Sequence, residues 1–232
     1  MGFISTELVL YIIIGIIVFD YIFERILDYL NSTYWSDELP EELSDIYEAD
    51  KYKKSQQYLR VKQRFSILVS SISFIAMILM LLLGGFAFLD QLCRSITLHP
   101  ILMALLYFGI LGLAADILST PFSIYNTFVI EERFGFNKTT VRTFILDKFK
   151  GLFLGLIIGG GLLSLIVWIY TSTGAWFWFI AWIVVSVFMI FMTMFYSNVI
   201  VPLFNKQEPL ESGELRKAIE SYAFRVKFKL KN

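Results

Sequence analysis

Histidine and cysteine are almost absent from this sequence, which contains only His99 and Cys93 among its 232 residues. A single cysteine excludes a disulfide within the chain, and a single histidine excludes any site that needs two. Charged residues are also scarce at 17%, and 20 basic residues balance 20 acidic ones. Soluble domains carry about 25% charged residues, and nucleic-acid-binding domains carry a basic excess. The composition therefore argues against a soluble enzyme and a nucleic-acid binder, and we expect Cys93 to be a small buried apolar residue.

Apolar residues, by contrast, make up 57% of the chain, and its mean hydropathy is +0.67. A helix needs about 20 mostly apolar residues to cross a bilayer. Five stretches meet this requirement: Phe3–Phe23, Phe65–Leu89, Ile101–Pro121, Gly151–Thr171 and Ala175–Val199. The first has no basic n-region and no small-x-small cleavage site, so we interpret it as a retained span. The sequence predicts an all-α fold, a polytopic membrane helical bundle with five transmembrane helices.

The basic residues predict the orientation of this bundle. Nineteen of the 20 lie in the loops 24–64 and 122–150 or after residue 201, and only Arg94 lies on the other side. Basic residues accumulate in cytoplasmic loops of membrane proteins. We therefore expect the N-terminus outside, both long loops in the cytoplasm, and a cytoplasmic C-terminus.

A polar stripe begins inside the third predicted span, where Asp116 follows fifteen uncharged residues. Its members recur every three or four residues: Asp116, Ser119, Thr120, Ser123, Asn126, Thr127 and Glu131. Intramembrane carboxylates are costly, and polar rows do not face lipid. Pro121 removes a backbone donor and predicts a kink. The stripe favours a water-filled cavity wall, and the alternative is one hydrogen-bonded carboxylate within a helical bundle.

Two further polar segments lie close to predicted span ends. The loop Glu131–Lys138 combines charges with two phenylalanines and a turn-forming glycine, which suggests a site or docking surface, although a solvated turn has the same pattern. Asp20, Glu24 and Asp28 recur at four-residue spacing where the first span ends. We interpret this row as a solvated charged face.

The segment Glu41–Leu83 contains no glycine or proline and carries oppositely charged pairs at helical spacing. We expect the second span to begin well inside the cytoplasm as one long helix.

The composition changes again after Pro202. Ser212 is a candidate N-cap for a helix from Gly213 to about Phe224. The segment Val226–Leu230 then alternates apolar residues with lysines, which is typical of a half-buried strand. A lone strand has nothing to pair with. We expect residues 202–232 to be the beginning of a soluble α/β cytoplasmic domain that either continues beyond Asn232 or is completed by a partner, and residues 1–201 to form the membrane bundle.

Three groups of segments resemble the type I CAAX prenyl protease family of integral-membrane zinc metalloproteases, in the same order and over nearly the whole chain. The first group is Leu39–Leu43 with Tyr52–Tyr58. The most specific is Pro121–Tyr125 with Thr127–Lys138, Asp147 and Lys150. The third is Pro202–Asn205 with Pro209–Glu211 and Gly213–Arg216.

The resemblance implies a seven-span bundle around a large chamber, with a zinc domain inserted after the fifth span. It also implies an HExxH zinc site, but this chain has no such motif, and its only histidine lies on the wrong side of the membrane. Zinc is thus implied for the full-length protein, while no catalytic residue or metal ligand can be assigned in this chain. The resemblance assigns these residues to the chamber: Asp116, Ser119, Thr120, Ser123, Asn126, Glu131, Glu132, Arg133 and Asn137.

The functional hypothesis is the N-terminal membrane and chamber portion of a CAAX-type zinc metalloendopeptidase that cleaves C-terminal peptide segments at the membrane. The chain by itself is expected to be inactive. Its expected partners are the lipid bilayer, a peptide or protein substrate with or without a prenyl group, and the missing catalytic domain in cis or in trans. The expected location is the bacterial cytoplasmic membrane or the endoplasmic reticulum membrane, depending on source. The alternative is a non-catalytic membrane scaffold or regulatory module acting with a separate protease subunit. A transporter, in which Asp116 serves an ion path, has less support because no paired broken-helix repeat is present.

Overall fold

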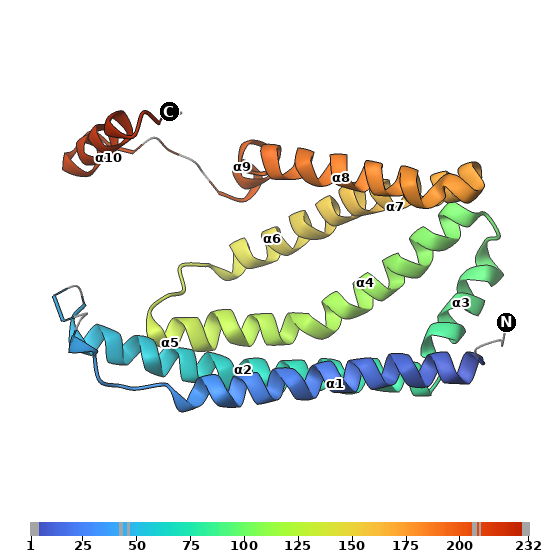
Figure 1. The fold of residues 1–232 in the computed structure, drawn as a ribbon, viewed down its shortest axis with the longest axis horizontal. Coiled ribbons are helices and arrows are strands. Elements are labelled where there is room, and N and C mark those ends of the chain that lie inside the picture. The colour runs from blue at the N-terminus through green and yellow to red at the C-terminus, as the bar shows by residue number, and fades with distance from the viewer. Residues whose placement is uncertain (1–4, 42–43, 46, 206–207, 209, 229–232) are drawn as a thin grey trace. The chain divides into compact units, whose positions relative to one another are not determined.

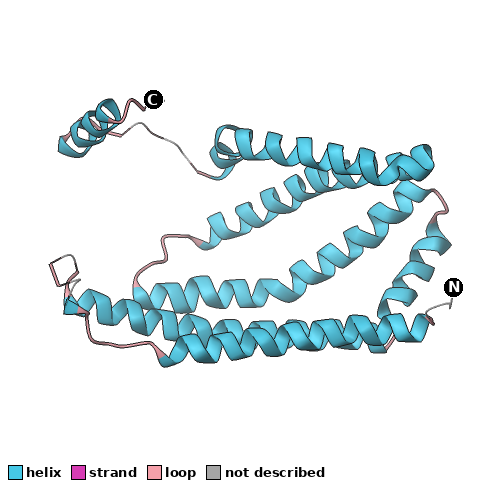
Figure 2. Cartoon of the chain, viewed as in Figure 1, coloured by secondary structure: helices cyan, strands magenta, loops and turns pink. Residues whose placement is uncertain are grey.

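The computed structural model describes residues 5–41, 44–45, 47–205, 208 and 210–228, and every regular element among them is helical (Figure 2). The chain divides into two compact units, Met1–Trp168 and Ile169–Asn232. The first unit contains α1 (Thr6–Thr33), α2 (Ala49–Leu82), α3 (Gly85–Ile96), α4 (Pro100–Tyr125), the π-helix η2 (Asn126–Glu131), α5 (Glu132–Phe134), α6 (Val141–Leu154) and the π-helix η3 (Gly155–Gly159). Helix α7 (Gly160–Thr173) crosses the boundary. The second unit contains η4 (Gly174–Trp176), α8 (Phe177–Phe195), η5 (Tyr196–Ile200), α9 (Val201–Phe204) and α10 (Glu214–Arg225).

Four continuous helical runs are long and apolar enough to cross a membrane: Thr6–Thr33, Ala49–Leu82, Pro100–Phe134 and Val141–Phe204. The last run has 64 residues and contains the fourth and fifth predicted spans. Between these two spans the helix is interrupted by the 3₁₀ turn η4, where Gly174 has a φ of +55°. This left-handed conformation, which glycine adopts without steric cost, interrupts the run between the fourth and fifth predicted spans.

Helix α2 confirms the expected long helix, but its bounds differ at both ends. It begins at Ala49 instead of near Glu41, and Glu48 precedes it and pairs with Lys51 at 2.9 Å. It ends at Leu82, so the predicted span Phe65–Leu89 is not one helix. Gly84 follows with a φ of +70°, the left-handed position that commonly terminates helices. Residues 85–89 belong instead to α3.

Helix α3 connects α2 to α4 and contacts both. Its inner face contributes Leu89, which is 7% exposed, and Cys93, which is fully buried. The expected role of Cys93 as a buried apolar residue is confirmed.

Helix α4 begins at Pro100 and continues through Pro121 into η2 and α5. In Figure 1 this helix changes direction along its length, as expected of a helix that contains a proline. The hydroxyls of Ser119 and Thr120 donate to the backbone carbonyl of Asp116 one turn earlier. Such bonds compete with the backbone ladder and often accompany helix bending.

The C-terminal segment after Pro202 contains the predicted helix, but the helix cap and the strand predicted there are not observed among the described residues. Helix α10 is present, but Gly213 is its N-cap and no side chain caps it, so the prediction for Ser212 is wrong. Residues 226–228 form no strand: Lys227 has a φ of +55°, and the Phe228 amide donates to the carbonyl of Ala223 at 2.9 Å. The alternating segment therefore begins as a helix terminus, because no neighbouring strand among the described residues offers backbone partners. The predicted strand residues after Phe228 lie outside the described residues.

Candidate functional site

A hydroxyl-lined pocket of about 490 Å³ lies between α2 and the α4–η2 helix. Its lining residues come from three turns of α2 and from the polar stripe: Lys62, Phe65, Ser66, Val69, Ser70, Ser119, Phe122, Ser123, Asn126 and Thr127. The pocket thus combines five hydroxyls, one amide and one ammonium group, and no carboxylate lines it. The Ser70 and Ser119 hydroxyls donate to the backbone carbonyls of Ile67 and Asp116. The hydroxyls of Ser66, Ser123 and Thr127 can donate hydrogen bonds to a polar or anionic ligand.

Three hydroxyl groups in this pocket have no hydrogen-bond partner among the described residues. Ser66, Ser123 and Thr127 make no side-chain hydrogen bond with any described residue. The Lys62 Nζ donates to the Tyr58 hydroxyl at 3.0 Å and lies 5.3 Å from the centroid of that ring. It makes no ion pair with the described carboxylates, although the Glu131 carboxylate attracts its positive charge electrostatically.

A second, apolar pocket of about 600 Å³ lies on the other side of α4, between the α4–η2 helix and α6. It is lined mainly by aliphatic and aromatic side chains, and Asp116, Thr120 and Lys148 are its polar members. The Lys148 Nζ lies 2.5 Å from a carboxylate oxygen of Asp116, with 26% and 30% of the two side chains exposed. The Phe128 and Phe144 rings meet edge to face at 5.6 Å and join the same helices.

The polar stripe therefore faces two pockets instead of one. Asp116 and Thr120 line the apolar pocket, while Ser119, Ser123, Asn126 and Thr127 line the hydroxyl-lined pocket. Asp116 is paired with Lys148, while the serine face of the stripe lines the hydroxyl-lined pocket.

The segment Glu131–Asn137 closes back on itself and on α2. Asn126 donates to Glu131 at 3.0 Å, and Asn137 donates to Glu132 at 2.9 Å. Gly135 has a φ of +75° and ends α5, and its amide donates to the carbonyl of Glu132 at 3.0 Å.

Aromatic contacts attach this segment to α2. Phe134 is only 6% exposed, and its ring centroid lies 5.4 Å from that of Tyr58. Phe136 lies 4.8 Å from the same ring. The segment is thus packed against α2 through its two phenylalanines and is not a freely solvated turn. Glu132 and Arg133 are exposed and line neither of the two pockets.

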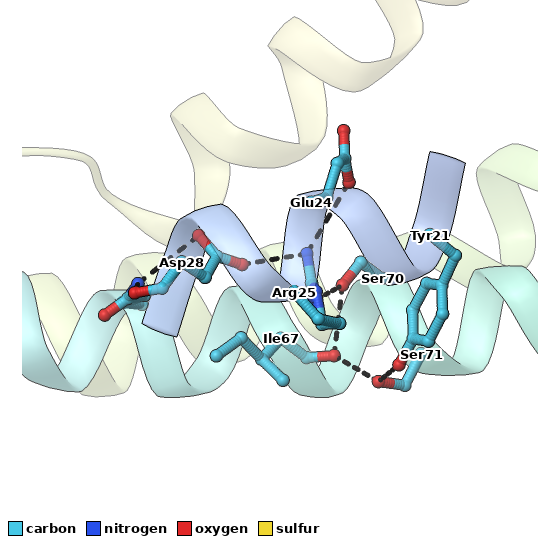
Figure 3. A network of polar contacts seen from close by, with 8 residues as sticks. Tyr21, Glu24, Arg25, Asp28, Ile67, Ser70 and Ser71 are labelled. Carbon is cyan, nitrogen blue, oxygen red and sulfur yellow. Dashed lines mark hydrogen bonds and ion pairs between the residues drawn. The ribbon is translucent and has the colours of Figure 1, made fainter. Parts of the chain in front are cut away.

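Arg25 organises a polar network between α1 and α2 (Figure 3). Its guanidinium donates to Ser70 at 2.7 Å and pairs with Asp28 at 2.9 Å and with Glu24 at 3.5 Å. Gln63 of α2 donates to Asp28 as well.

The network corrects the interpretation of the first charged row. Asp20 and Glu24 are exposed as expected, but Asp28 is only 32% exposed and has two partners. Beside it, the hydroxyls of Tyr21 and Ser71 are hydrogen-bonded at 2.7 Å. Ser70 also lines the hydroxyl-lined pocket, so the Arg25 network and the pocket share this residue.

Sequence reasoning missed Lys62 and Lys148. Lys62, Ser66 and Ser70 recur at four-residue spacing, which predicts one polar face of α2 and was an available signal. No comparable signal relates Lys148 to Asp116, which is 32 residues away. Among the residues that the structure describes, no cluster of three or more histidine, cysteine, aspartate or glutamate side chains could hold a metal ion.

The long apolar helices define a polytopic helical membrane protein. Comparison with known proteins identifies the family. Residues 28–206 match the family described as the CAAX prenyl protease N-terminal region with five membrane helices, and the chain belongs to this family. Five is also the number of spans that the sequence predicts.

The relatives include whole proteins that are longer than this chain. It is 33% identical to CAAX prenyl protease 1 of Saccharomyces cerevisiae, covering 94% of this chain and 51% of that protein. The CAAX prenyl protease 1 homolog of Arabidopsis thaliana is 32% identical, with 94% and 54% covered. The crystal structure of S. mikatae Ste24p superposes with a TM-score of 0.85 at 31% identity, over 96% of this chain and 53% of that one. The chain thus spans about half the length of these relatives.

Proposed function

We propose that this chain forms the membrane and substrate-chamber portion of a CAAX-type zinc metalloendopeptidase that cleaves C-terminal peptide segments at the membrane. The observation that carries the proposal is the family match over residues 28–206 together with the likeness to Ste24p over nearly the whole chain. Zinc, its ligands and the general base belong to the part of the enzyme outside these 232 residues. The substrate is a peptide or protein, prenylated or not.

The two pockets support a chamber on physical grounds. A polar row within an apolar span is stable only where it meets protein partners or water, because lipid offers no hydrogen bonds. Ser123 and Thr127 lack side-chain partners among the described residues, so water or a ligand must satisfy their hydroxyls. The chamber-lining residues proposed here are Asp116, Ser119, Thr120, Ser123, Asn126, Glu131, Glu132, Arg133 and Asn137.

Cysteine accessibility tests the chamber. In a Cys93→Ser background, Ser123→Cys is expected to react with a charged, membrane-impermeant methanethiosulfonate when the chain is in proteoliposomes. Ile117→Cys is the matched control on the same helix, because Ile117 is 69% exposed but lines neither pocket. Equal, slow labelling at both positions would show that the serine face is dry and would contradict the chamber.

Proteolysis tests the enzyme class. The chain replaces the matching half of the S. cerevisiae protease, and the chimera is assayed on a farnesylated C-terminal peptide. Chelator-sensitive cleavage is expected from the chimera, and none from the 232-residue chain supplied with zinc. A chimera that inserts and retains zinc but cleaves nothing would favour the non-catalytic scaffold, and chelator-sensitive turnover by the chain alone would refute the predicted inactivity.

A further inference from the structure

We propose that the hydroxyl-lined pocket binds the C-terminal end of an extended peptide, with Lys62 pairing with its terminal carboxylate. This inference rests on the proposed function and names the part of the substrate that the pocket recognises. It makes Lys62 a residue that sets specificity for substrates ending at a free C-terminus.

The charge distribution supports an anionic ligand. Lys62 is the only ionisable residue that lines the pocket, and it has no ion-pair partner among the described residues. The Glu131 carboxylate, which does not line the pocket, attracts the Lys62 charge electrostatically, but it accepts a hydrogen bond from Asn126 and lies beyond ion-pair distance of Lys62. The Tyr58 hydroxyl, 3.0 Å from the Lys62 Nζ, holds the ammonium group in place without neutralising it. An ammonium group held in this way is pre-organised for a carboxylate.

The shape of the hydroxyl row favours a peptide over a compact anion. Lys62, Ser66 and Ser70 lie on successive turns of α2 and span about 12 Å at 1.5 Å per residue. An extended peptide advances about 3.3 Å per residue, so three to four residues match this length. On the facing helix, Ser119, Ser123 and Thr127 repeat every four residues and supply hydroxyls to the same row. A free phosphate would use only the end beside Lys62.

The position of the row relative to the membrane suits a lipid-modified substrate. Lys62 lies in the predicted cytoplasmic loop 24–64, whereas Ser70 lies inside the predicted span. With the terminal carboxylate at Lys62, a residue three positions earlier lies about 10 Å deeper, close to the level of Ser70. A lipid attached to that residue then reaches the hydrocarbon region.

Peptide binding to the purified 232-residue chain tests the proposal without any turnover. The probe is a fluorescein-labelled peptide ending in S-farnesylcysteine and three aliphatic residues, prepared as the free acid and as the C-terminal amide. Anisotropy is measured in dodecylmaltoside micelles, with empty micelles as the blank. The wild-type chain is expected to prefer the acid by about tenfold, the ratio that one charge-assisted hydrogen bond provides.

The variants separate a carboxylate contact from general effects. Lys62→Gln is expected to reduce the acid preference to below about twofold, and Lys62→Arg to retain most of it. Lys53→Gln is the matched control, because Lys53 is an exposed lysine on the same helix that lines neither pocket. The pair Ser123→Ala and Thr127→Val keeps the charge and is expected to weaken acid and amide alike, by about threefold to tenfold.

Three results would overturn the proposal. The first is a wild-type chain that binds the acid and the amide equally. The second is an unchanged preference for the acid in Lys62→Gln, and the third is an equal loss of this preference in Lys62→Gln and Lys53→Gln. Displacement of the acid peptide by millimolar inorganic phosphate or by anionic phospholipid as completely as by excess unlabelled acid peptide would assign the pocket to a phosphate group and overturn the proposal as well. Because the readout is binding, its failure is distinct from a failure of the chimera to cleave.

Discussion

Lys148 of α6 forms an ion pair with Asp116 of α4 at 2.5 Å, across 32 residues of sequence and beside an apolar pocket. The pair gives the one carboxylate of the third predicted span a counter-charge. It also ties the third span to the helix that begins the fourth. Both side chains are about a quarter to a third exposed, so the pair is partly shielded from solvent.

Removing one partner of this pair is expected to destabilise the protein. Asp116→Asn and Lys148→Met each leave a partly buried charge without its partner, at a cost of about 1–2 kcal/mol. That cost corresponds to a fall of roughly 2 to 8 °C in the thermal unfolding midpoint in a fixed detergent. The double variant should lose less than the sum of the single variants by about 1 kcal/mol. A strictly additive double-mutant cycle would show that the two groups do not interact.

The Tyr58 ring is expected to hold the Glu131–Asn137 segment on α2. Tyr58→Ala removes two aromatic contacts, each with a contribution of about 0.5–1.5 kcal/mol. Hydrogen exchange at the Gly135 and Phe136 amides, which bond to carbonyls of the preceding turn, should accelerate about tenfold. Tyr58→Phe keeps the ring and is the control. Equal acceleration in both variants would assign the effect to the hydroxyl that binds Lys62.

Arg25 is expected to contribute more to the α1–α2 contact than its acidic neighbour Glu24. Arg25→Gln weakens the bonds to Ser70 and Asp28 and should cost about 1–2 kcal/mol, because hydrogen bonds to charged groups are the stronger kind. Glu24→Gln alters a 3.5 Å contact of a side chain that is 58% exposed, and we expect a change within about 0.5 kcal/mol. Thermal unfolding of the two variants measures the difference. A larger loss for Glu24→Gln would contradict the network in Figure 3.

The orientation in the membrane remains a prediction and can be tested with two single cysteines. In a Cys93→Ser background, Ser95→Cys and Ser212→Cys lie at exposed positions on opposite predicted sides. An impermeant maleimide added to intact bacterial spheroplasts that express the chain should label position 95 only, and lysis should allow labelling of position 212. Labelling of position 212 in intact spheroplasts would reverse the topology predicted from the basic residues.

The membrane class and the helical fold could be predicted because they depend on composition and on local sequence. Apolar runs of span length have few stable alternatives to a helix in a bilayer, and the absence of glycine and proline between Glu41 and Leu83 predicted a long α2. Two incorrect predictions concern the end of one helix and one short strand. The predicted span through Leu89 ignored the left-handed Gly84. The predicted strand Val226–Leu230 gave too much weight to a short alternation, since its described residues 226–228 follow the end of a helix.

The site could be predicted only in part, because periodicity places a residue on a face of its own helix and does not identify the facing helix. The stripe from Asp116 to Glu131 was visible as a row, but its members divide between two pockets because α2 and α6 pack on different sides of α4. Lys62 shares a helical face with Ser66 and Ser70, so its position beside these two serines could have been inferred from the sequence. The ion pair between Lys148 and Asp116 could not have been inferred in this way.

The sequence by itself thus determined that this protein is a bundle of membrane helices, since the cost of exposing backbone groups to lipid leaves little other choice, and its motifs indicated the CAAX protease family. Only the tertiary structure decided which polar groups meet. Helix packing places the ammonium of Lys62 at the end of a row of hydroxyls from two helices and gives Asp116 its counter-charge. These contacts join residues distant in the chain, and their formation depends on how helices pack, which local sequence does not specify.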